Sequence, residues 1–167
     1  MITAEQVKKL KLGYSKETLS NLFPGKGLTA KEVATKTDGV WKVISSIERL
    51  DILTQLISGR AKREFLARIL ERRLNRYKTT HKQSAKVLAA IRDNAVTDKL
   101  YKEISGTYAK GIEYRRVGVA YAAVNAVLNG GEDPAKAAFF AILSCGTAAK
   151  RRAEIRLQLK DLMELFE

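Results

Sequence analysis

Helix start and stop signals recur along the whole chain, whereas runs that alternate apolar and polar residues between turns are hard to find. Thr3 and Thr29 each precede a Gln or Glu by three residues, which is the spacing of a capping box. With 167 residues and only two prolines, the chain has the size of one domain, or of one core with a small head. The sequence therefore predicts an all-α fold, a compact bundle of about eight to ten helices.

The chain divides into two parts by the length of its predicted helices. Residues 1–57 form a head of short helices, the last of which is predicted over 40–57. Residues 58–167 continue with a basic helix and an alanine-rich segment, and both parts are predicted to make one compact unit. A helix-turn-helix made of 28–36 and 40–46 is an alternative for the head, because the intervening turn is short and contains glycine.

An alanine-rich helical hairpin is predicted near the C-terminus. From 107 to 129 the apolar positions are mostly glycine and alanine, and small residues let neighbouring helices approach closely. Two glycines then stop this helix, and Asp133 with Pro134 starts the next one as a cap and first helical residue. Gly106 is predicted to end the helix before the hairpin, and Gly146 to interrupt the chain before the terminal helix.

The charge of the chain is large and unevenly distributed. The formal net charge is +13, and residues 60–92 alone hold eleven basic residues and two acidic ones. On a helical wheel Arg68, Arg72 and Arg76 form one stripe whose centre lies well over 90° from the apolar face, so they are predicted to point outward. No acidic residue stands three or four positions from Arg72 or Arg76 to offset their charge.

A surface of this kind predicts an anionic partner, and the phosphate backbone of DNA or RNA is the commonest one. Arginine suits bidentate contact with phosphate, and a second basic cluster, Lys150-Arg151-Arg152 with Arg156, opens the terminal helix. No RRM-like, KH-type or zinc-finger motif accompanies the charge, so little sequence specificity is expected. The residues predicted to contact nucleic acid are Arg60, Arg63, Arg68, Arg72, Arg73, Arg76, Lys78, Lys82, Lys86, Lys150, Arg151 and Arg152.

Two alternatives stay open for the basic surface. It could match an acidic protein partner, or it could be a solvated face that keeps the protein dispersed. The carboxylates of the terminal helix, Glu154, Asp161, Glu164 and Glu167, are predicted to pair with lysines and arginines of that same helix.

Candidate chemistry is sparse, because the chain has one cysteine and one histidine. Cys145 lies in an alanine-rich helix, where a buried inert thiol is expected, and His81 is expected to be exposed beside a helix start. A structural zinc site needs several Cys or His ligands. No paired carboxylates or phosphate-binding glycine loop are visible either. The sequence predicts a protein that is not an enzyme, with no metal site and no cofactor.

The sequence also predicts a soluble, cytoplasmic protein without membrane contact. Its longest uncharged stretches, 117–131 and 137–149, are shorter than the ~20 residues of a membrane-spanning helix. A disulfide within the chain is impossible with one cysteine, and the first residues lack the basic-then-apolar order of a secretory signal.

The head segment Asn21-Leu22-Phe23-Pro24-Gly25-Lys26-Gly27-Leu28-Thr29, followed by Glu32 and Trp41, resembles the opening of small helical phage and bacterial proteins labelled as immunity proteins. The order of the remaining parts is similar: a basic helix at 63–76, a second helix at 85–92, an alanine-rich hairpin and a polar, leucine-containing end at 156–165. The resemblance implies a phage or mobile-element accessory protein that inhibits or shields another protein, and it implies no functional residue.

Overall fold

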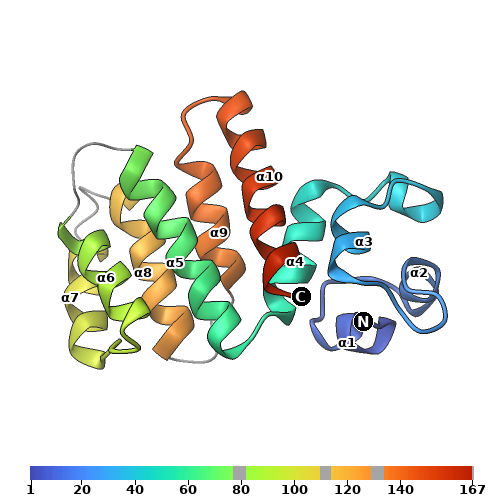
Figure 1. The fold of residues 1–167 in the computed structure, drawn as a ribbon, viewed down its shortest axis with the longest axis horizontal. Coiled ribbons are helices and arrows are strands. Elements are labelled where there is room, and N and C mark those ends of the chain that lie inside the picture. The colour runs from blue at the N-terminus through green and yellow to red at the C-terminus, as the bar shows by residue number, and fades with distance from the viewer. Residues whose placement is uncertain (77–81, 110–113, 129–133, 167) are drawn as a thin grey trace.

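The computed structural model describes residues 1–76, 82–109, 114–128 and 134–166 (Figure 1). Within these ranges the chain forms ten α-helices, one 3-10 helix and no strand, which confirms the predicted all-α bundle. The helices, in chain order, are α1 (Ala4–Lys9), α2 (Lys16–Leu22), α3 (Ala30–Thr35), the 3-10 helix η1 (Gly39–Lys42), α4 (Ser46–Leu56), α5 (Gly59–Arg76), α6 (Lys82–Arg92), α7 (Asp98–Ala109), α8 (Tyr114–Leu128), α9 (Pro134–Leu143) and α10 (Ala148–Leu165).

The molecule is elongated, with α1, α2 and α3 at one end and α6 and α7 at the other (Figure 1). Between them, α8 packs against α6, α7 and α9, while α10 packs against α3, α4, α5 and α9. α10 therefore contacts both the short helices of the head and the long helices of the bundle. Along the described ranges, no helix combines the length and the apolar character that crossing a membrane requires.

The capping boxes define where the head helices begin. Those predicted at Thr3 and Thr29 are confirmed, and the structure adds a third, in which Ser45 and Glu48 start α4. The prediction of one helix over 40–57 is wrong, because Ser45 takes an extended N-cap conformation after the single turn of η1. The helix-turn-helix alternative fails for the same reason, since 40–45 forms no α-helix and α4 begins only at Ser46.

The third capping box gives the head a pH-dependent contribution. Hydrogen bonds from the Ser45 hydroxyl and backbone N–H hold the pKa of the Glu48 carboxyl below its usual value. The ionised carboxylate therefore stabilises the fold fully above the ordinary glutamate pKa of about 4.3, and this contribution is lost as the pH falls through the lowered folded-state value.

Glu48→Gln is expected to reduce the free energy of unfolding by about 1 kcal/mol at pH 7, measured by urea denaturation. The difference from the wild type should shrink when the pH is lowered from 5 to 3, with Glu17→Gln in α2 as the exposed control. A difference that stays constant over this range would contradict the assignment.

The turn over 24–27 ties the first residues of the chain to the head. Ile2 and Leu28 form an isolated antiparallel bridge, in which their backbone N–H groups donate to each other's carbonyl at 2.6 and 2.9 Å. Gly27 has a φ of +88°, and a Cβ atom there would lie 2.2 Å from the Ile2 carbonyl oxygen. Only glycine fits this close approach.

The core of the head is organised around a buried arginine, Arg49, which is 6 % exposed. Its guanidinium donates to the carbonyls of Ile44, Val33 and Trp41 at 3.1, 3.0 and 2.7 Å, and lies 5.1 Å from the centroid of the Trp41 ring. Burial lowers the pKa of Arg49. One charged side chain thus satisfies three carbonyl groups from α3, η1 and the segment before α4.

The alanine-rich hairpin is confirmed, because α8 and α9 pack against each other. The buried alanines of these two helices are Ala120, Ala122, Ala123, Ala126, Ala137, Ala138 and Ala141. The predicted interruption near Gly146 is also confirmed, since α9 ends at Leu143 and Thr147 caps α10. The predicted helix end at Gly106 is wrong, because α7 continues to Ala109.

Candidate nucleic-acid interface

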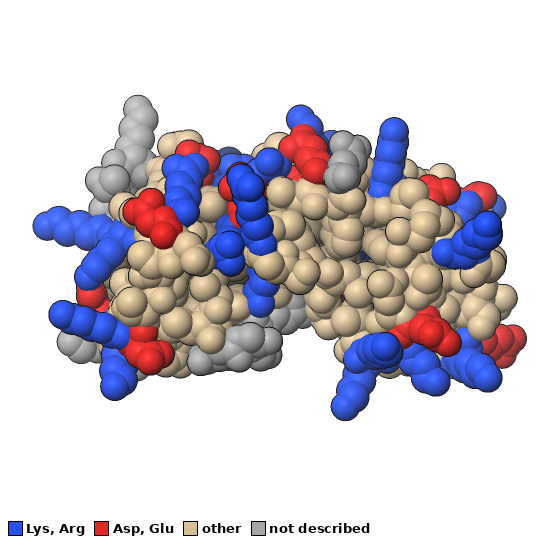
Figure 2. All heavy atoms as spheres, turned by 60° about the horizontal axis from the view of Figure 1, so that its bottom comes forward, with Lys and Arg blue, Asp and Glu red and all other residues tan. Residues whose placement is uncertain are grey.

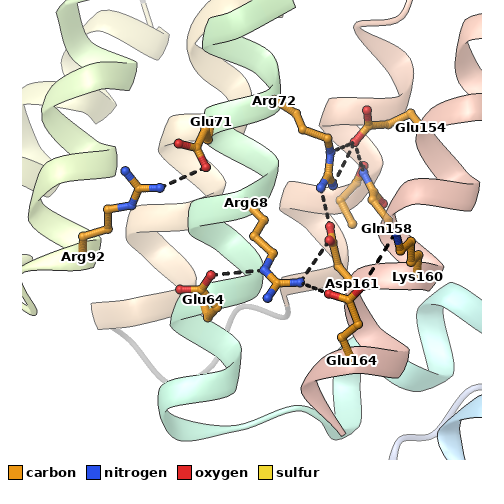
Figure 3. Close-up of polar contacts among 11 residues, drawn as sticks. Glu64, Arg68, Glu71, Arg72, Arg92, Glu154, Gln158, Lys160, Asp161 and Glu164 are labelled. Carbon is orange, nitrogen blue, oxygen red and sulfur yellow. Dashed lines mark hydrogen bonds and ion pairs between the residues drawn. The ribbon is translucent and has the colours of Figure 1, made fainter. Parts of the chain in front are cut away.

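Two residues of the predicted arginine stripe, Arg68 and Arg72, face another helix instead of solvent. Arg68 and Arg72 have side chains that are 29 % and 21 % exposed, and both extend across the α5–α10 contact (Figure 3). The wheel places this stripe away from the apolar face of α5, but α10 packs along that side. The prediction that these two arginines point outward is therefore wrong. Arg72, which has no local counter-charge in the sequence, pairs with carboxylates of α10.

Arg72 neutralises two carboxylates of α10. Its Nε and one terminal nitrogen lie 3.3 Å from Glu154 Oε1, and its other terminal nitrogen bonds Asp161. Glu154 is 2 % exposed and also accepts a hydrogen bond from Gln158 Nε2 at 3.0 Å, while the same nitrogen donates to the Ala138 carbonyl at 3.2 Å. These contacts join α5, α9 and α10 through one buried polar network.

Arg68 continues the network toward the end of α10. It donates to Glu64 at 3.1 Å, to Asp161 at 3.3 Å and to Glu164 at 2.6 Å. Its hydrogen bond to Glu164 makes the largest contribution to raising the pKa of Arg68. Because three carboxylates already accept hydrogen bonds from this guanidinium, its positive charge is compensated within the protein and attracts an external phosphate only weakly.

The carboxylates of α10 are the partners that sequence reasoning missed. Glu164 does pair with Lys160 of its own helix, at 3.9 Å, but Glu154 and Asp161 pair with α5 instead of with the lysines and arginines of α10. Glu154 and Asp161 are seven residues apart, which places both on one side of α10. This spacing was the sequence signal that could have indicated a shared partner on another helix. Glu167 lies outside the described residues.

Several other residues of the predicted nucleic-acid site do not contribute to one exposed surface. Arg73 is only 9 % exposed, so the prediction that it contacts nucleic acid at the surface is wrong. Lys86 is exposed and bonds Glu103 of α7 at 2.5 Å. Lys78, His81 and the side chain of Arg76 lie outside the described residues.

Two groups of exposed cations remain, at different places in the fold. Arg60, which is exposed, and Arg63, which is half-buried, lie in the first turns of α5, beside the end of α6. Lys82 is exposed at the opposite end of α6. Arg92, the last residue of α6, lies 2.9 Å from Glu71 in an exposed ion pair.

The second group opens α10. Lys150, Arg151, Arg152 and Arg156 are all exposed, and none has a carboxylate partner in the described part of the chain. Arg151 Nε donates to the carbonyl of Cys145 at 3.1 Å, which fixes the start of its side chain at the turn before the helix. As expected, Cys145 itself is buried, but it lies in the turn between α9 and α10 and not in a helix.

The exposed cations do not form one continuous surface. The ion pairs of α5 with α10 show that the two helices are antiparallel, so the starts of α5 and α10 lie toward opposite ends of the pair. Figure 2 shows one face of the molecule, where lysines and arginines lie toward both ends with carboxylates among them. The start of α10 is the densest exposed group in the predicted set.

Comparisons of the chain with protein-family models, curated proteins and solved structures find no match. The proposed function therefore rests on the residues of the site.

Proposed function

We propose that this protein binds nucleic acid through the phosphate backbone, with little sequence specificity and without catalysis. The contact surface is the start of α10, formed by Lys150, Arg151, Arg152 and Arg156. This proposal keeps the chemistry that the sequence predicts and moves its centre from α5 to α10, because the carboxylates of α10 neutralise Arg68 and Arg72.

The observation that supports this surface is a reversal of the usual charge order at a helix start. The N-terminus of a helix carries a partial positive charge, and an acidic residue in the first turn is favourable there. The first turn of α10 contains no acidic residue, and three consecutive cations begin within it at Lys150. Their charges and the helix dipole add up to a concentrated positive potential, which favours phosphate groups.

Neutralising this surface is expected to weaken nucleic-acid binding without changing the fold. Lys150→Gln, Arg152→Gln and Arg156→Gln combined should lower the affinity for a labelled single strand or duplex by about tenfold or more. For duplex DNA, the slope of log affinity against log salt concentration should fall by about 0.9 for each phosphate that the variant no longer neutralises. Fluorescence anisotropy over a salt series measures both effects.

The matched control removes the same charge from the head, with Lys16→Gln, Lys26→Gln and Lys31→Gln combined. These lysines are exposed and lie far along the molecule from α10's start. Equal reductions in affinity for the two variants would show that only the net charge matters and would reject the α10 surface. Undetectable binding by the wild type at low salt would reject the proposed function.

A protein partner, as for an accessory or immunity-type protein, is a second candidate, supported by an apolar hollow between α4 and α9. Its volume is about 370 Å³, and Leu50 and Ile142 line it together with Ile47 and Phe139, which are 48 % and 49 % exposed. Large apolar side chains in a concave surface are typical of protein interfaces. A complex centred there would depend only weakly on salt, unlike phosphate binding.

A further inference from the structure

A small hollow between the start of α5 and the end of α6 gathers three arginines. It has a volume of about 210 Å³ and is lined by Arg60, Arg63, Arg92 and Asn94, with Glu64 as the one acidic residue. Two of these arginines come from successive turns of α5, and Arg92 and Asn94 come from the end of α6 and the turn after it. Residues from separate elements therefore enclose this space.

The carboxylates near the hollow are already engaged. Glu64 accepts a hydrogen bond from Arg68 at 3.1 Å, and Glu71 lies 2.9 Å from Arg92. Neither Arg60 nor Arg63 has a carboxylate partner among the residues that the structure describes. Glu71 thus already compensates Arg92, and Arg60 and Arg63 are the two guanidinium groups of the lining whose mutual repulsion an anion would relieve.

The backbone around the hollow is fixed without a ligand. Asn94 takes a left-handed conformation, with a φ of +53°, and its N–H donates to the Ile91 carbonyl at 3.3 Å. The N–H of Ala95 donates to the Ala90 carbonyl at 2.8 Å. These two bonds close the end of α6, so that Arg92 and Asn94 are held beside α5.

The size and the donors of the hollow define the ligand. Sites for drug-sized molecules usually measure about 300–1,000 Å³, so a hollow of about 210 Å³ suits a single small group. Guanidinium groups donate in a planar fork that matches phosphate oxygens, and charge-assisted bonds of this kind are the strong ones. Arg60 and Arg63, with the Glu71-paired Arg92 beside them, are suited to the negative charge of a phosphomonoester.

We propose that this hollow is a phosphate-binding site, which takes the phosphoryl group of a phosphomonoester or free inorganic phosphate. It is separate from the α10 surface and does not rest on the proposed function. The same chemistry can come from a small phosphorylated molecule or from the terminal phosphate of a nucleic-acid chain.

The test is a titration of the protein with inorganic phosphate at constant ionic strength, followed by the amide chemical shifts in NMR. Saturable shifts are expected at 60–64 and 91–94. Arg60→Gln with Arg63→Gln should weaken phosphate binding by about tenfold or more, because the variant cannot form these charge-assisted hydrogen bonds. The control, Lys26→Gln with Lys31→Gln, removes equal charge from the head and should bind phosphate as the wild type does.

A second arm distinguishes the two sources of phosphate. Oligonucleotides that differ only in a 5′-phosphate or a 5′-hydroxyl are compared with the wild type and with both variants. If the wild type prefers the 5′-phosphate and the Arg60→Gln, Arg63→Gln variant does not, the site binds the terminal phosphate of a nucleic-acid chain. If the wild type shows no preference, the site binds a small phosphate compound. Absent or non-saturable shifts of the wild type with phosphate, or shifts that persist in the arginine variant, would overturn the proposal.

Discussion

Replacing Arg49 with methionine is expected to reduce the free energy of unfolding by about 3 kcal/mol. Methionine fills much of the space of the arginine stem but removes the Arg49 donors from the carbonyls of Val33, Trp41 and Ile44, of which Trp41 keeps only the long hydrogen bond from the Ile44 N–H at 3.4 Å. A buried polar group that loses its partner costs about 1–3 kcal/mol, and partial relaxation lowers the sum over three such groups. The substitution also removes the cation–π interaction with the Trp41 ring.

Urea denaturation followed by tryptophan fluorescence measures this effect, because Trp41 is the only tryptophan of the chain and lies beside Arg49. Arg49→Lys serves as the comparison. It keeps the charge but cannot reach three carbonyls with one ammonium group, so a smaller destabilisation of about 1–2 kcal/mol is expected. Equal stability of the methionine variant and the wild type would show that the three hydrogen bonds contribute nothing net.

Arg72→Met is expected to cost about 2–4 kcal/mol, because it leaves two carboxylates at the α5–α10 contact without their main cation. Glu154 is the more costly of the two, since it is 2 % exposed. Breaking a buried ion pair from one side usually costs about 3–5 kcal/mol, and the partial exposure of Arg72 lowers the expected value. The free energy of unfolding from urea denaturation is the measurement.

Two variants sharpen this second prediction. Arg92→Gln removes an exposed ion pair with Glu71 and should cost less than about 1 kcal/mol. Arg72→Met combined with Glu154→Gln should recover part of the stability, because the uncompensated buried charge is then removed. Additive destabilisation in the double variant would mean that Arg72 and Glu154 are not coupled, against the geometry in Figure 3.

The fold was largely predictable from local signals. The boxes at Thr3 and Thr29 each act within four residues, so the sequence near them is sufficient to define these helix starts. The described part of α9 begins at Pro134, the residue predicted to be its first, while Asp133, its predicted cap, lies outside the described residues. The error over 40–57 arose because apolar spacing continues across Ser45, whose cap interrupts the helix. Gly106 was misread as a helix end although α7 accommodates it.

The site was less predictable, because a helical wheel shows the relative directions of side chains but not which side a later helix covers. Arg68 and Arg72 are opposite the apolar face of α5, yet their partners on α10 lie 82 to 96 residues further along the chain. The buried position of Arg49 was not predictable for a similar reason, because its three carbonyl acceptors come from segments that only the folded head brings together.

The position of α10 has a consequence for how the protein forms during synthesis. The carboxylates that complete the polar network belong to a helix made almost a hundred residues after Arg68, and the same helix packs on α3 and α4. While α10 is still inside the ribosome, the emerged arginines of α5 have none of these partners. Contacts so distant in sequence slow the search for the native state, so final assembly is expected to follow translation of α10.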